Sequence, residues 1–135
     1  MTPDEYMAKA RRSQESAHLL LDAEDLVGAV NRAYYAMFYA AHASLTHAGI
    51  EVPSAKHGTL ISRFGQHLVK SGRVPDHLGR WLNRALELRS TGDYGDVPPD
   101  QREAQEAIAR AQAFLEAIDK LLATSPSVTP RGRRA

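Results

Sequence analysis

The sequence contains no cysteine, and it has little that would suit a membrane or an export pathway. Without thiols the chain forms no disulfide, no thiolate zinc site and no cysteine nucleophile. No apolar run approaches the roughly 18 residues that a membrane span needs, and the first residues lack the basic-then-apolar pattern of a signal peptide. We therefore expect a cytoplasmic protein that does not enter a membrane.

The common catalytic and nucleotide-binding motifs are also missing. The sequence has no H-E-x-x-H, no Walker-type glycine loop, no G-x-S-x-G and no G-x-G-x-x-G. Six histidines occur, but no pair of them has an acidic residue between its members at metal-binding spacing. We expect no metal ion and no cofactor, and nothing in the sequence favours a hydrolase triad.

β-Branched residues are scarce as well. Valine (7) and isoleucine (4) are outnumbered by alanine (21) and leucine (14) in the 135 residues. Alanine and leucine lose little freedom in a helix, whereas β-branched residues lose more. The composition predicts an all-α protein with one domain, an up-and-down bundle of about five helices over residues 1–123.

Caps and breakers divide the chain into the expected helices. Thr2 and Asp25 suit helix N-caps, and glycines and prolines interrupt the pattern between segments. The expected helices cover residues 2–21, 25–47, 54–70, 76–92 and 99–123. The second is apolar nearly all round, so it is either the central helix or one that faces a second subunit. Residues 124–135, rich in Pro, Ser, Thr and Arg, are predicted to be a disordered basic tail.

The net charge of +1 hides an uneven distribution. Residues 53–90 carry seven basic and two acidic side chains, whereas residues 91–123 carry three basic and seven acidic ones. A basic middle of this kind suits the phosphate backbone of a nucleic acid. Charge alone favours the other interpretation, in which these residues pair with the acidic helices of the same chain.

Two polar clusters stand out. In the second helix, Asn31 and Tyr35 share one face, and a buried Asn or Arg must find a partner. Such a cluster is typical of a hydrogen-bonded layer that fixes helix register. At the end of the fourth helix, Arg89 and Asp93 are spaced to pair across one turn. Alternatively, Arg89 binds a phosphate oxygen beside a Tyr94 hydroxyl that positions or protonates a ligand.

These clusters resemble the HEPN superfamily, most closely its short bacterial and archaeal branch. The matching stretches are A-x-N-R-A-Y-Y-A-M-F at residues 29–38, a K-H pair at 56–57, and R-x-x-x-D-Y at 89–94. Their order and spacing span residues 5–122. The resemblance implies a helical bundle that forms a homodimer and brings two copies of the arginine motif to one cleft.

Active HEPN ribonucleases carry an R-x(4–6)-H motif, in which the arginine handles the scissile phosphate and the histidine serves in metal-independent RNA cleavage. Here Tyr94 stands where that histidine is expected, and no histidine occurs from residue 78 onward. His57 would replace it if the fold brings it to Arg89. The resemblance therefore assigns catalytic roles to Arg89, Asp93, Tyr94 and His57. The residues assigned to binding are Asn31, Arg32, Tyr35, Lys56 and Ser90.

Two functions fit this pattern. The first is a dimer that engages RNA or a nucleotide, in a toxin–antitoxin or defence module. Because the motif histidine is missing, the sequence is compatible both with RNA cleavage and with binding alone. The second is a non-catalytic subunit that binds a minimal nucleotidyltransferase antitoxin. In some pairs of this kind the antitoxin adenylylates a tyrosine near the arginine motif, a role for which Tyr94 is the candidate.

Overall fold

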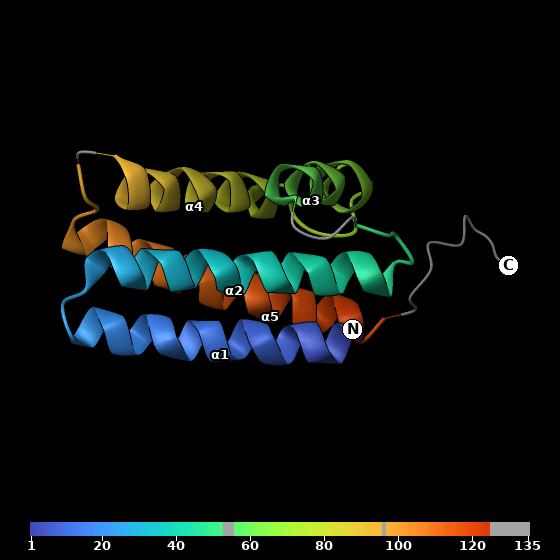
Figure 1. The fold of residues 1–135 in the computed structure, drawn as a ribbon. Coiled ribbons are helices and arrows are strands. Elements are labelled where there is room, and N and C mark those ends of the chain that lie inside the picture. The colour runs from blue at the N-terminus through green and yellow to red at the C-terminus, as the bar shows by residue number, and fades with distance from the viewer. Residues whose placement is uncertain (53–55, 96, 125–135) are drawn as a thin grey trace, which may run out of the picture.

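The computed structural model describes residues 1–52, 56–95 and 97–124, with the side chains of Asp93 and Tyr94 left out. These residues form helices and no strand, as the composition predicts (Figure 1). The predicted disordered tail falls almost wholly outside the described residues. The elements are α1 (Pro3–Asp22), α2 (Leu26–His47), α3 (His57–Phe64), the π-helical turn η1 (Gly65–Val69), α4 (Asp76–Tyr94) and α5 (Gln101–Leu122).

The helix starts follow the capping residues of the sequence. Thr2 and Glu5 form a capping box at α1, in which the Thr2 backbone N–H donates to Glu5 Oε1 at 2.7 Å. Asp25 Oδ1 accepts the Gly28 N–H at 2.9 Å at the start of α2. Each cap satisfies backbone donors that a helix start leaves without partners. Gly49, at φ +78°, ends α2 in a conformation that glycine adopts easily.

Helix α2 is the centre of the bundle. It packs against α1, α3, α4 and α5, and in Figure 1 it runs between α1 and α4 with α5 behind it. Its buried side chains are Ala29, Val30, Ala33, Tyr34, Ala36, Met37, Ala40, Ala41, Ala43, Ser44 and Leu45. The many alanines let neighbouring helices approach closely on several sides. The sequence predicted that this helix is either the central helix or one that faces a second subunit. Its packing against four other helices supports the central position.

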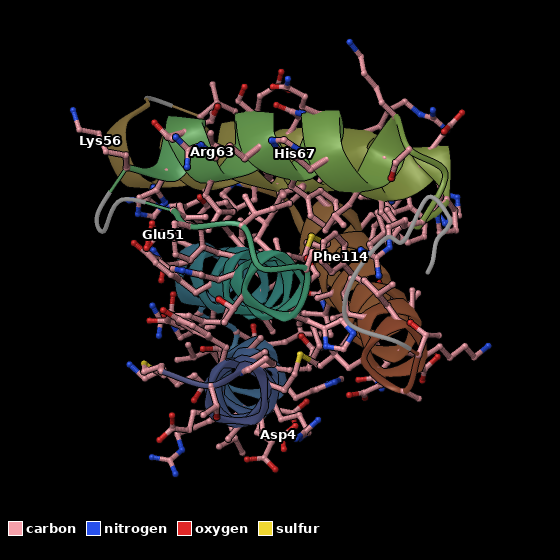
Figure 2. The ribbon with its side chains drawn as sticks, turned by 90° about the vertical axis from the view of Figure 1, so that its right-hand side faces the viewer. Asp4, Glu51, Lys56, Arg63, His67 and Phe114 are labelled. Atoms are coloured by element: carbon pink, nitrogen blue, oxygen red, sulfur yellow. The ribbon has the colours of Figure 1, made fainter. Side chains whose placement is uncertain are left out.

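Helix α3 and η1 lie on the same side of α2 as α4 and run across the bundle axis rather than along it. Figure 2, which looks along α1 and α2, shows this segment lying crosswise above them. The sequence predicted one continuous helix over residues 54–70. The described helix starts at His57, residues 53–55 lie outside the described part, and α-helical geometry gives way to a π-helical turn after Phe64. The crosswise course carries His57, at the start of α3, onto α2.

Helix α4 extends past Gly92, where the sequence predicted its end, and continues to Tyr94. An added Cβ at Gly92 would be 3.4 Å from Pro99 Cδ and 3.7 Å from Val27 Cγ1, which is ordinary van der Waals contact. Gly92 does not have the positive φ of Gly49 and Gly72, and the helix continues through it. The helix ends at Gly95, whose N–H donates to the Thr91 carbonyl at 2.8 Å.

Candidate functional site

The first residue of α3 meets the middle of α2 in a cluster of rings. His57 Nδ1 lies 2.6 Å from the hydroxyl oxygen of Tyr34. The imidazole stacks on Phe38, with 4.3 Å between ring centres and 23° between planes. It also meets the edge of Tyr35 at 5.6 Å. A hydrogen bond and ring contacts on different sides hold the His57 ring in one orientation.

Tyr34 is the buried member of this pair. Its side chain is 0% exposed, so its hydroxyl depends on a protein partner, which His57 provides. Burial raises the pKa of the Tyr34 phenol well above its usual range, and the positive charge of Arg89 only partly offsets that effect. The phenol therefore keeps its proton at neutral pH. Its hydroxyl donates a hydrogen bond to His57 Nδ1 or accepts one from Nδ1–H, depending on the histidine tautomer.

Arg89 reaches the same cluster from α4. Its guanidinium carbon lies 5.5 Å from the ring centres of both Tyr34 and Tyr35. Burial lowers the pKa of His57, and the charge of Arg89 lowers it further. The imidazole is consequently neutral at pH 7, beside a permanent cation. The fold thus brings His57 to Arg89, the juxtaposition on which the sequence interpretation depended.

Arg32 and Asn31 form the neighbouring part of the site on α2. The Arg32 guanidinium lies over the Tyr35 ring at 4.8 Å. Its Nε and Nη2 donate to Asn31 Oδ1 at 3.1 and 2.9 Å. The Tyr35 ring therefore has two arginines near it, Arg32 from α2 and Arg89 from α4. The predicted polar cluster on this helix is present, and it is continuous with the arginine of α4.

The structure connects the remaining predicted residues less closely to the cluster around His57 and Arg89. Lys56 precedes α3, is exposed, and points away from the bundle in Figure 2. Ser90 is half-buried next to Arg89 in the chain. Asp93 and Tyr94 belong to the last turn of α4, and the predictions for their side chains fall outside the described ones.

Sequence reasoning missed Tyr34 and Phe38 as members of the site. Neither was named as a site residue, although Tyr34 carries a hydroxyl and lies in the middle of the N-R-A-Y-Y-A-M-F string. A tyrosine on the most buried helix must find a hydrogen-bond partner, and that requirement was the available signal. The identity of the partner required the position of α3.

The described part of the chain shows neither a candidate metal site nor a candidate membrane span. Within it, no three His, Asp or Glu side chains gather in a way that could hold a metal ion. No described helix is both long and apolar enough to cross a bilayer.

Comparison with known proteins places the chain in a family. The family model described as HEPN domain matches residues 4–121. The chain is 41% identical over 118 residues to a UPF0332 protein of Thermotoga maritima, covering 87% of this chain and 88% of that protein. It is 39% identical over 127 residues to a UPF0332 protein of Gloeobacter violaceus, covering 91% and 99%. A Methanocaldococcus jannaschii protein named "Putative toxin" is 32% identical over 113 residues, covering 84% and 83%. With a family model spanning nearly all of its helices, the chain belongs to the HEPN domain family.

Proposed function

We propose that this protein is a toxin-like RNA-binding HEPN protein that acts as a homodimer, with Arg89 and His57 in contact with the RNA. The observation that carries the proposal is the approach of Arg89 and His57 to the same tyrosine rings. The family membership and the toxin name of one relative support the toxin-like role.

Arg89 suits the recognition of a phosphate group. Its planar guanidinium can offer two parallel N–H donors to phosphate oxygens. The faces of Tyr34 and Tyr35 lie beside it and limit its movement. We expect Arg89 to hold the phosphate that undergoes reaction, and Arg32 to contact a neighbouring phosphate.

His57 suits proton transfer at that phosphate. In metal-independent cleavage, the ribose 2′-oxygen forms a bond to phosphorus while the bond from phosphorus to the 5′-oxygen breaks. The 2′-hydroxyl proton goes to a base, and the departing 5′-oxygen takes a proton from an acid. A neutral imidazole accepts the first proton through Nε2 when Nδ1–H donates to the Tyr34 oxygen. The second proton comes from water.

We infer the homodimer from the family resemblance, and analytical ultracentrifugation would test it. The chain has a mass of 14.9 kDa, so a dimer sediments as a species of about 30 kDa. A species of monomer mass only, at micromolar concentration, would contradict the dimer.

The activity test compares RNA cleavage by the wild-type protein with that by Arg89→Ala and His57→Ala. Arg80→Ala is the matched control, because Arg80 is an exposed arginine on the same helix. We expect loss of cleavage in the first two variants and wild-type cleavage in the control, with folded protein in each case by circular dichroism. A wild-type protein that neither binds nor cleaves RNA would refute the proposal and favour the partner-binding role.

A further inference from the structure

A second basic surface lies between α1 and α2, in a part of the sequence that is acidic overall. Residues 1–25 carry three basic and six acidic side chains. Two of the three basic ones, Lys9 and Arg12, nevertheless line a groove of about 440 Å³ together with Arg32 of α2. The other lining residues are Ala8, Ser13, Ser16 and Tyr39, so the groove has three cations and no carboxylate.

The three cations of the groove form no ion pair with any residue that the structure describes. Among the residues that the structure describes, Lys9, Arg12 and Arg32 have no carboxylate partner, whereas the adjacent Arg11 pairs with Asp119 of α5 at 3.4 Å. Ring faces hold two of these cations: Lys9 Nζ lies 5.5 Å from the Tyr39 ring centre, and Arg32 lies over Tyr35. Their positive charge is thus held in place and remains available to an anion.

The groove is continuous with the site at Arg89. Arg32 lines the groove and stacks on Tyr35, the same ring that Arg89 approaches. The two distances to that ring limit the separation of the two guanidinium carbons to about 10 Å. From Arg32 to Tyr39 the groove follows α2 for two turns, or about 10 Å at the rise of an α-helix. α1 runs antiparallel beside it (Figure 1).

We propose that this groove binds the sugar-phosphate backbone of the RNA strand on one side of the phosphate held by Arg89. A row of cations with serine and tyrosine hydroxyls suits contacts to phosphate and ribose, which give affinity without reading the base sequence. The inference rests on the proposed RNA-binding function, and it adds the direction in which the strand leaves the site.

The test is a matched pair of charge reversals on α1. Arg12→Glu changes the groove, and Arg11→Glu changes the neighbouring exposed arginine, which faces α5 instead. Both variants have the same net charge, so a difference between them reports position. The probe is a fluorescein-labelled 2′-O-methyl RNA of about twelve nucleotides, within the usual range of single-strand site sizes, which binds but cannot be cleaved.

We expect Arg12→Glu to weaken binding at least about tenfold more than Arg11→Glu at low salt. It should also flatten the slope of log affinity against log salt by about 0.7 for each lost phosphate contact. The two variants could have equal effects while the wild-type protein still binds RNA and Arg89→Ala does not. That result would overturn the inference that the groove binds RNA and leave the proposed function standing. Dissociation of the dimer by Arg12→Glu alone would identify the groove as a subunit interface and also overturn the inference. A wild-type protein that does not bind the probe would overturn both.

Discussion

Replacing Tyr34 by phenylalanine removes one oxygen from the centre of the site and leaves the ring in place. The lost group is the hydroxyl 2.6 Å from His57 Nδ1. A hydrogen bond between uncharged groups contributes about 0.5–1.5 kcal/mol net. His57 is half-buried, so water can partly replace the lost partner, and we expect a loss of about 1 kcal/mol. For a chain of this length that is a fall in Tm of roughly 3–5 °C.

The matched control is Tyr6→Phe. Tyr6 also stacks on a histidine, with 4.0 Å between its ring centre and that of His42, but its hydroxyl has no hydrogen-bond partner among the described residues. Thermal melts by circular dichroism at pH 7.5 should separate the two variants, with Tyr6→Phe close to wild type. If Tyr34→Phe melted within about 1 °C of wild type, the hydrogen bond to His57 would contribute nothing, and the reasoning about the orientation of the imidazole would be wrong.

Three further outcomes follow from the structure. Phe114 is fully buried and stacks on Phe64, with 5.5 Å between ring centres. Phe114→Ala should lower the free energy of unfolding of the protein by about 3–5 kcal/mol, measured by urea denaturation. Burial lowers the pKa of His57 and of His42, so the unfolded chain binds more protons than the folded chain as the pH falls. The contribution of these two histidines to stability is therefore present above about pH 6.5 and declines as the pH falls below that value. His57→Gln should reduce that decline in melts between about pH 5 and 7.5, and an unchanged pH profile would contradict it. Because burial raises the pKa of Tyr34, its phenol should stay protonated below about pH 11. Tyr34→Phe should therefore leave the absorbance change at 295 nm unchanged in a titration up to that pH.

Much of the fold follows from local sequence, since caps and helix periodicity act over a few residues. Thr2, Asp25 and Gly49 mark helix ends in the sequence and in the structure. Gly92 did not end its helix: it keeps helical backbone geometry and lies within contact distance of Val27 and Pro99. Such a contact joins distant segments, so no local pattern reveals it.

The site was predictable in its residue types and only partly in its arrangement. The motifs singled out Arg89 and His57, but their meeting depends on the crosswise course of α3, which tertiary packing determines. The partner of His57 is Tyr34, whereas the sequence interpretation named Tyr35 and Asn31 for a polar layer. The sequence did not predict the groove at Lys9 and Arg12, because the net charge of a segment does not tell which side of a helix carries the basic residues.

The central claim is that Arg89 and His57 share one site, and a proton NMR titration of the His57 ring tests it most directly. The comparison is between wild type, Arg89→Gln and the control Arg80→Gln, an equal loss of charge from an exposed position on the same helix. The wild-type pKa of His57 should lie below the usual histidine value, because burial and the charge of Arg89 both lower it. Removing that charge should raise the pKa in Arg89→Gln and leave it unchanged in Arg80→Gln. The same pKa in wild type and in folded Arg89→Gln would contradict the account.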